Sequence, residues 1–303
     1  MRPKPNLFHL VILTSFAYTT EFGQTYSSNK NVEAVPIAST EGIKLKIMSY
    51  QGTPHSGDVA SNIALIQQTV IGAKHLGCDV VVFPELFITG YNIDRHVIAL
   101  AETIDGPMIS QIKRIAMGAG IAIVIGFPES DNEKIYNSAV VINSNGDLVG
   151  HHRKVFLFGD KEKSLFTPGD TFTTFNLNGY CCGMSICYDI EFPEPIRILA
   201  NKGAHIVFNP TANMEPYHEV PKTLARARAL ENGVCIVYAN LSGVEDGLKY
   251  TGLSAIIGPD GLDIARAGRS SAVIVADVSE ILLMNKHNPT STQSHDLAQV
   301  QFS

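Results

Sequence analysis

The apolar run Gly183-Met184-Ser185-Ile186 stops abruptly at the thiol of Cys187. Acidic residues and prolines follow, in the segment Tyr188-Asp189-Ile190-Glu191-Phe192-Pro193-Glu194. The pattern predicts a buried strand that ends at Cys187, with a helix starting in the proline-rich part. A cysteine placed in this way is a candidate nucleophile. Because a thiol attacks only as its thiolate, the chain should also supply a base and a cation to generate or stabilise that thiolate.

A carboxylate and an amine occur in comparable positions elsewhere in the chain. Glu85 ends the apolar run VVVFP at residues 80–84, and Lys154 follows the apolar run 140–142 and a turn at residues 145–147. The strand ends of one sheet can converge on one pocket. Taken singly, Glu85 and Lys154 also fit an exposed loop carboxylate and a surface charge, and Cys187 fits a small buried hydrophobe.

Short apolar runs alternate with amphipathic stretches from Gly42 onward. This alternation is typical of an α/β protein whose strands are buried on at least one face. We expect strands at residues 43–49, 79–83, 121–126, 138–143, 180–187, 205–209, 234–240, 254–258 and 272–277.

Four helices are predicted between these strands, at residues 58–76, 107–120, 193–203 and 219–232. Helical spacing of apolar residues defines the buried face of each, and glycines or prolines mark the ends. In the last helix the predicted buried face contains Val220, Leu224, Ala227 and Leu230, which leaves Arg226 and Arg228 on the other faces.

Composition excludes several classes of protein. The chain has 303 residues, 45% hydrophobic and 17% charged, enough for one large domain or two ordinary ones. A net charge of -6 without a basic patch argues against a nucleic-acid partner and favours a small neutral or cationic ligand. The five cysteines lack Cys-x-x-Cys spacing and no paired histidine motif occurs, so neither a metal site nor another cofactor is expected.

Residues 1–42 differ from the rest and form a leader. Arg2 and Lys4 precede the apolar stretch Leu7 to Ala17, which suggests a signal peptide cleaved after Ala17; a disordered leader is the alternative. The stretch is shorter than the roughly 20 residues of a membrane span, so none is expected in the mature chain. The protein would be secreted or periplasmic with a signal peptide, and cytoplasmic otherwise. The predicted domain covers residues 43–285, followed by a tail at 286–303.

Three sequence blocks resemble the nitrilase superfamily of carbon–nitrogen hydrolases. They are FPELF with Gly90-Tyr91, HRK at 152–154, and ICYD with FPE at 192–194, in order over residues 43–277. A fourth block, FGDKEK at 158–163 with FTPGD at 166–170, resembles the segment after the family's lysine. The resemblance implies a four-layer α-β-β-α sandwich, of α/β class, that forms a homodimer or a higher homo-oligomer.

The resemblance also assigns roles to the residues of these blocks. Glu85 would be the general base and acid, Lys154 the oxyanion cation and Cys187 the nucleophile that forms a thioester with a small carboxamide. The backbone N–H of Tyr188 would be a second oxyanion donor, and Glu162 would support Lys154 or the substrate. Ammonia and a carboxylic acid are the expected products.

The residues that follow Cys187 also bear on the substrate class. Tyr188 and Asp189 stand where true nitrilases of the superfamily carry tryptophan and glutamate, so amides are preferred over nitriles. Glu191 stands where ω-amidases carry arginine. The segments 209–216, 225–232 and 258–261 look most like bacterial amidases described as R-stereoselective, which act on carboxamides of cyclic amines. Tyr91, Asn213 and Glu191 are candidate pocket residues, and Glu191 and Glu215 suggest an amine-bearing carboxamide, with rim or structural carboxylates as the alternative.

Three other functions are open at this point. The same three residues could hydrolyse an N-carbamoyl amine and release carbon dioxide as well as ammonia. The thioester could instead be intercepted by an amine, as in the lipoprotein-modifying relatives, although these carry several membrane spans. Finally, the chain could be a non-catalytic scaffold. Proteins that have lost activity in this way usually lack the nucleophile, the base or the lysine.

Overall fold

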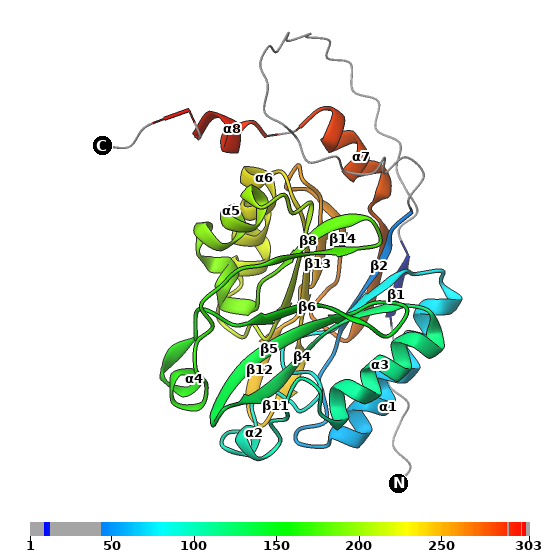
Figure 1. Ribbon diagram of the computed structural model, residues 1–303, viewed down its shortest axis with the longest axis vertical. Coiled ribbons are helices and arrows are strands. Elements are labelled where there is room, and N and C mark those ends of the chain that lie inside the picture. The colour runs from blue at the N-terminus through cyan, green and yellow to red at the C-terminus, as the bar shows by residue number, and fades with distance from the viewer. Residues whose placement is uncertain (1–8, 13–43, 290, 298, 301–303) are drawn as a thin grey trace.

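The computed structural model describes residues 9–12, 44–289, 291–297 and 299–300 (Figure 1). The predicted cleavage site after Ala17 lies outside these residues. Three sheets are present in this part of the chain. The first has the order β1 (His9–Ile12), β15 (Ala272–Asp277), β2 (Lys46–Gln51), β3 (Val80–Val82), β4 (Ala122–Asp131), β5 (Lys134–Ile142) and β6 (Leu148–Arg153).

The second sheet has six strands and the third is a hairpin. The second has the order β14 (Asp263–Arg266), β13 (Ala255–Ile257), β10 (Cys235–Asn240), β9 (Ile206–Thr211), β8 (Tyr180–Met184) and β7 (Thr174–Leu177). The hairpin is β11 (Ser242–Glu245) with β12 (Leu248–Thr251).

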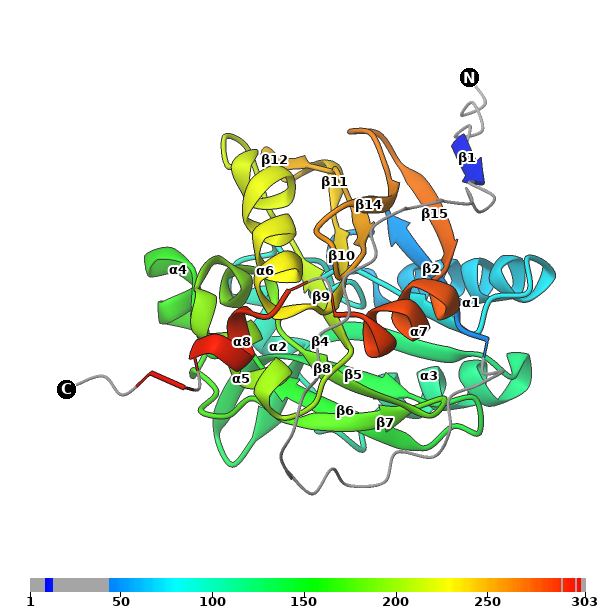
Figure 2. The ribbon, with the colours of Figure 1, turned by 90° about the horizontal axis from the view of Figure 1, so that it is seen from above.

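Helices cover the outer faces of the two large sheets (Figures 1 and 2). On one side lie α1 (Val59–His75) and α3 (Pro107–Ala119), and on the other α5 (Pro193–Asn201) and α6 (Ala225–Asn232). The remaining helices are α2 (His96–Ala99), α4 (Gly159–Leu165), α7 (Ser279–His287) and α8 (Gln293–Leu297), with a 3₁₀ turn η1 (Cys187–Glu191) and a π turn η2 (Val220–Leu224).

Three apolar cores separate the layers. One joins α1 and α3 to the first sheet, a second lies between the two sheets, and a third joins α5 and α6 to the second sheet. The strand β3 shows how one run serves two cores: Val80 and Val82 pack between the sheets, while Val81 packs under the helices. Successive side chains of a strand point to opposite faces, which is why a strand buried on both faces is apolar throughout. The four-layer α-β-β-α prediction is confirmed.

The predicted boundaries of the first helices are confirmed closely. In α1, Ile63, Ile66 and Val70 are buried as expected, and the side chain of Asp58 caps the helix by accepting a hydrogen bond from Ser61 N. The helix α3 ends at Gly120, whose left-handed backbone (φ 70°) suits glycine.

The predicted buried face of the helix at 219–232 is confirmed at Val220 but wrong farther along the helix. Leu230 is exposed, while Ala225, Arg228 and Ala229 are buried. The cause is the π turn η2, because a π turn holds one residue more than an α turn and rotates every later side chain around the axis. Arg228, expected on an outer face, is therefore turned toward the protein interior.

Several strands were not predicted from the sequence. They are β1, β6, β7, β11, β12 and β14, all four to six residues long. The omission of β6 matters most for function, because it ends at Arg153 and delivers Lys154. Its residues LVGHHR are half polar and show no apolar run, although they pair with β5 along the strand.

Candidate active site

Glu85, Lys154 and Cys187 all lie just beyond strand ends, as predicted. Glu85 follows β3, Lys154 directly follows β6, and Cys187 follows β8. The detail at the thiol differs from the prediction, since β8 ends at Met184 and Cys187 begins the 3₁₀ turn η1.

The backbone is left-handed at two points beside these residues. Cys187 has φ 46°, and Leu86, directly after Glu85, has φ 48°. A non-glycine residue in this region stores backbone strain that the surrounding structure must hold, and such residues concentrate at functional sites. Close packing holds the second one: a Cβ on Gly126 of β4 would lie 2.4 Å from Leu86 N, so only glycine fits there.

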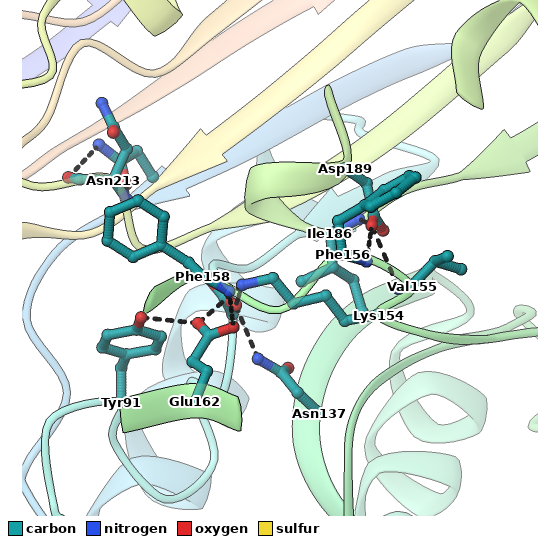
Figure 3. A network of polar contacts seen from close by, with 12 residues as sticks. Tyr91, Asn137, Lys154, Val155, Phe156, Phe158, Glu162, Ile186, Asp189 and Asn213 are labelled. Carbon is teal, nitrogen blue, oxygen red and sulfur yellow. Dashed lines mark hydrogen bonds and ion pairs between the residues drawn. The ribbon is translucent and has the colours of Figure 1, made fainter. Parts of the chain in front are cut away.

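Lys154 lies at the centre of the site with no exposed surface (Figure 3). Its Nζ is 2.7 Å from Glu85 Oε1 and 2.7 Å from Glu162 Oε1. Burial alone lowers the pKa of Lys154, but the charges of Glu162 and Glu85 outweigh burial and raise this pKa well above its ordinary value. The site therefore contains a permanent, fixed ammonium group.

Glu85 presents one bonded and one unbonded oxygen. Oε1 accepts hydrogen bonds from Lys154 Nζ and from Asn137 Nδ2, both at 2.7 Å. Oε2 is buried and has no hydrogen-bond partner among the described residues. Burial raises the pKa of Glu85 above 4.5, against the opposing charge of Lys154. The carboxylate is therefore a stronger base than an ordinary glutamate, with a free oxygen.

Glu162, on the short helix α4, is the second carboxylate that bonds the Lys154 ammonium. Its Oε1 also accepts from the Tyr91 hydroxyl at 2.7 Å, and its Oε2 accepts from Phe158 N at 2.8 Å (Figure 3). The predicted proximity of Glu162 to Lys154 is thus observed. Tyr91, expected in the substrate pocket, directs its hydroxyl at this supporting carboxylate.

A further carboxylate, Glu245 of β11, holds the loop that carries Tyr91. Glu245 is 2% exposed, and its Oε2 accepts from the backbone N–H groups of Tyr91 at 3.3 Å and Asn92 at 3.0 Å. Gly90 precedes them with φ 96°, and a Cβ there would lie 2.4 Å from Glu245 Oε1. Glycine at this position lets the loop approach the carboxylate.

The Cys187 thiol is buried and close to the charged cluster. Burial, reinforced by the charge of Glu85, raises the pKa of Cys187 well above 9, while the Lys154 ammonium and the nearby Thr211 hydroxyl act in the opposite direction. A raised pKa favours the protonated thiol over the thiolate. Reaction at this sulfur needs a base to remove the proton at the moment of attack.

Tyr188, whose N–H is the predicted second oxyanion donor, is the second residue of η1. N–H groups in the first turn of a helix lack an intrahelical partner, so this position suits an anion. The Tyr188 ring lies 5.2 Å from the Phe158 ring and 5.1 Å from the Phe192 ring, between centroids. Together with Phe156 and Tyr217 these rings form an aromatic wall that includes Tyr188, the residue after Cys187, and that the sequence did not predict.

The remaining predicted pocket residues differ in whether their side chains already have hydrogen-bond or ion-pair partners. Asn213 uses its side-chain N–H groups on Tyr217 O and Thr251 Oγ1, so it holds the loop before Tyr217. Glu215 pairs with His218 at 2.6 Å and Arg269 at 3.3 Å, which places its carboxylate in an ion-pair cluster and favours the structural alternative. Glu191 is half-buried, and burial raises its pKa above 4.5 while Lys154 lowers it.

Two supporting residues escaped the sequence analysis. Asn137 donates to Glu85 and, through its carbonyl oxygen, accepts from Lys154 N at 2.8 Å. Arg228 donates to the carbonyl oxygens of Ile190 at 3.1 Å and Glu191 at 2.8 Å and so holds the turn after Cys187. No local pattern distinguishes Asn137, and the π turn that buries Arg228 is invisible to an α-helical period.

Within residues 9–12, 44–289, 291–297 and 299–300, no helix is long and apolar enough to cross a membrane. In the same part of the chain, no three histidine, cysteine, aspartate or glutamate side chains are grouped in a way that could hold a metal ion.

Comparison with known proteins places this site in a family. The sequence profile of the carbon-nitrogen hydrolases matches residues 46–281. A Pseudomonas protegens protein named "Hydrolase in pqqF 5'region" is 42% identical over 81% of this chain and 87% of its own length. An (R)-stereoselective amidase from a Pseudomonas species is 33% identical over 78% of this chain and 86% of its own length.

Solved structures of a Nesterenkonia amidase are similar in fold. One has a TM-score of 0.72 and 31% identity, and covers 80% of this chain and 94% of the amidase. Another, of a variant with acrylamide added to the active-site cysteine, has a TM-score of 0.71 and 30% identity over 80% and 96% of the two chains. With these similarities added to the site geometry, the chain belongs to the carbon–nitrogen hydrolase family.

Proposed function

We propose that this protein is an amidase that hydrolyses a small carboxamide to a carboxylic acid and ammonia, with Cys187 as nucleophile, Glu85 as general base and acid, and Lys154 as oxyanion cation. The observation that supports this assignment best is the arrangement around Lys154. The buried Lys154 ammonium bridges the carboxylates of Glu85 and Glu162. Glu85, the proposed base for the thiol, keeps one oxygen without a hydrogen-bond partner among the described residues.

Acylation uses the free oxygen of Glu85 first. Glu85 accepts the thiol proton while the sulfur bonds to the amide carbon, and the carbonyl oxygen becomes an oxyanion. Lys154 and the N–H of Tyr188 stabilise that oxyanion. When the tetrahedral intermediate collapses, the C–N bond breaks and protonated Glu85 returns its proton to the nitrogen, which leaves as ammonia.

Deacylation repeats the sequence with water. Glu85 removes a proton from water as the oxygen attacks the thioester carbon, the oxyanion forms at the same donors, and the C–S bond breaks. The proton on Glu85 returns to the sulfur. Glu162 holds the ammonium in place through both steps because its Oε1 accepts a second hydrogen bond from Lys154 Nζ, besides the one to Glu85.

Glu85→Gln tests this mechanism directly. An amide side chain cannot accept a proton from the thiol or from water, so both steps slow by about 10² to 10⁴, the usual contribution of a general base. We expect slow acylation, and a peptide containing Cys187 that gains the mass of the acyl group after prolonged incubation with a primary carboxamide. Acid-quenched mass spectrometry checks this, with ammonia measured in parallel.

The same experiment separates the alternatives. An adduct with the mass of a carbamoyl group from an N-carbamoyl amine, together with carbon dioxide release, would favour the carbamoyl hydrolase. An adduct on a peptide other than that of Cys187 would contradict the assignment of the nucleophile. Glu133→Gln is the control, because Glu133 lies in an exposed turn, and it should turn over as wild type does.

We further propose that the substrate carries a cationic amine, as in carboxamides of cyclic amines. The carboxylate of Glu191 has no hydrogen-bond or ion-pair partner among the described residues, unlike that of Glu215, and it lies on the turn that begins at Cys187. Tyr188 of the aromatic wall lies on the same turn, and aromatic faces also attract cations.

Two substrates of nearly equal shape test the role of Glu191. We expect piperidine-3-carboxamide, which is cationic at neutral pH, to exceed cyclohexanecarboxamide in kcat/KM by about fivefold, which corresponds to the roughly 1 kcal/mol of one partly solvated ion pair. Glu191→Gln should reduce that ratio to near one, whereas Glu194→Gln, on the exposed start of α5, should keep it. Equal turnover of both substrates by wild type would remove the proposal.

Assembly is a separate proposal. We propose that the enzyme acts as a homodimer or higher homo-oligomer, with no nucleic-acid partner. Ile198 of α5 and Leu230 of α6 are 39% and 41% exposed on the outermost helical layer, which supplies apolar surface for a helix-mediated contact.

A further inference from the structure

Asp189 is fully buried and all its acceptor positions are occupied. Its Oδ2 accepts from Ile186 N at 3.0 Å and from His152 Nε2 at 2.9 Å. Its Oδ1 accepts from Phe156 N at 2.8 Å and from Val155 N at 3.1 Å (Figure 3). Because four donors bond this one carboxylate, the carboxylate and each donor are held in fixed positions.

The donors are immediate neighbours of two proposed catalytic residues. Ile186 directly precedes Cys187, and Val155 directly follows Lys154. One carboxylate is thus bonded to the backbone beside the nucleophile and to the backbone beside the oxyanion cation. The two segments come from different sheets, since β8 leads to the first and β6 to the second.

No direct hydrogen bond among the described residues joins the Cys187 turn to the Lys154 segment apart from those at Asp189. The contrast with the other side of the site is informative. There, Asn137 bonds both Glu85 and Lys154 N and thereby links base to cation. Asp189 makes the corresponding link between the backbone beside Lys154 and the backbone beside Cys187.

We propose that Asp189 is a positioning residue that sets the separation between the Cys187 sulfur and the Lys154 ammonium. Its carboxylate joins the segment that follows β6 to the segment that follows β8. The left-handed backbone of Cys187 is strained, and the hydrogen bond to Ile186 N holds the turn in that conformation. A shift of about 1 Å between reacting groups can cost about 10² in rate, so this spacing matters for catalysis.

The proposal rests on the proposed roles of Cys187 and Lys154. Its test is Asp189→Asn and Asp189→Glu, compared with Asp263→Asn. Asp263 is also engaged by several donors, from Arg226 and Arg266, but it lies on β14 away from the site. Activity is measured per folded molecule, with circular dichroism and thiol titration fixing the folded fraction.

We expect Asp189→Asn to lower kcat by about 10²-fold with KM changed less than threefold, because chemistry is disturbed more than binding. Alkylation of Cys187 by iodoacetamide at pH 7 should slow by about tenfold, since the thiolate moves away from the cation that stabilises it. Asp189→Glu keeps the charge but lengthens the side chain, so it should not restore kcat. Asp263→Asn should leave both rates unchanged.

Full kcat in either Asp189 variant would overturn the proposal while leaving the roles of Cys187 and Lys154 intact. Full activity in a Cys187→Ala variant would instead remove the proposed function itself, so the two failures are distinguishable. If Asp189→Asn does not fold, His152→Phe serves in its place, because it removes one donor and keeps a ring stacked on Phe172. An unchanged kcat and alkylation rate in that variant would also overturn the proposal.

Discussion

Replacing Cys187 with alanine is expected to lower kcat/KM for carboxamides by about 10⁴-fold or more. Without the nucleophile of a hydrolase, the only remaining rate enhancement comes from substrate binding and from the oxyanion donors. Glu85 has no thiol proton to accept, and the thioester cannot form. Ammonia release from a primary carboxamide, measured with a coupled assay, checks the prediction.

The control is a second buried free thiol. Cys78 is 5% exposed and packs under α1, far along the first sheet from the site. Cys78→Ala should retain wild-type turnover, with at most a small loss of thermal stability from the missing sulfur. Residual activity above about 1% in Cys187→Ala would contradict covalent catalysis at this cysteine. Absence of turnover in wild type across a panel of amides would favour the non-catalytic scaffold.

Lys154→Met is expected to lower kcat by about 10³-fold, since one oxyanion donor is worth about 10² to 10³ and the fixed charge that offsets two carboxylates is lost as well. The pH dependence should change in a defined direction. Lys154 lowers the pKa of Cys187 and of Glu85, so its removal raises both. The pH profile for iodoacetamide labelling of Cys187, and the acid limb of kcat/KM, should therefore move to higher pH.

Lys161→Met is the matched control, because Lys161 is a half-exposed lysine of α4 that pairs with Asp94 at 2.6 Å on the surface. It should change neither rate nor profile. Because removal of one partner from a buried ion pair costs about 3–5 kcal/mol, the folded fraction of Lys154→Met must be determined first. A labelling profile identical to wild type would show that the ammonium does not act on the thiol.

Glu85 and Cys187 were predictable as strand-end residues because that signal is local, whereas the four-layer fold and the role of Lys154 came from the resemblance to the carbon–nitrogen hydrolases. An apolar run that ends in a polar residue identifies a strand and its functional end, as at Glu85 and Cys187, and a helical period identified the buried face of α1. The same rules failed where geometry departs from the standard period. The π turn at Val220–Leu224 rotated the next helix, and the half-polar strand β6 carried no apolar run.

By itself, the order of residues determined which chemical groups this protein has and which kinds of element carry them. Only the packing of two sheets decided that Lys154 lies between Glu85 and Glu162, that Asp189 bonds the neighbours of both Lys154 and Cys187, and that Arg269 pairs with Glu215. The physical reason is distance along the chain. Periodicity reports on neighbours a few residues apart, whereas contacts between segments tens of residues apart depend on how whole layers bury their apolar faces.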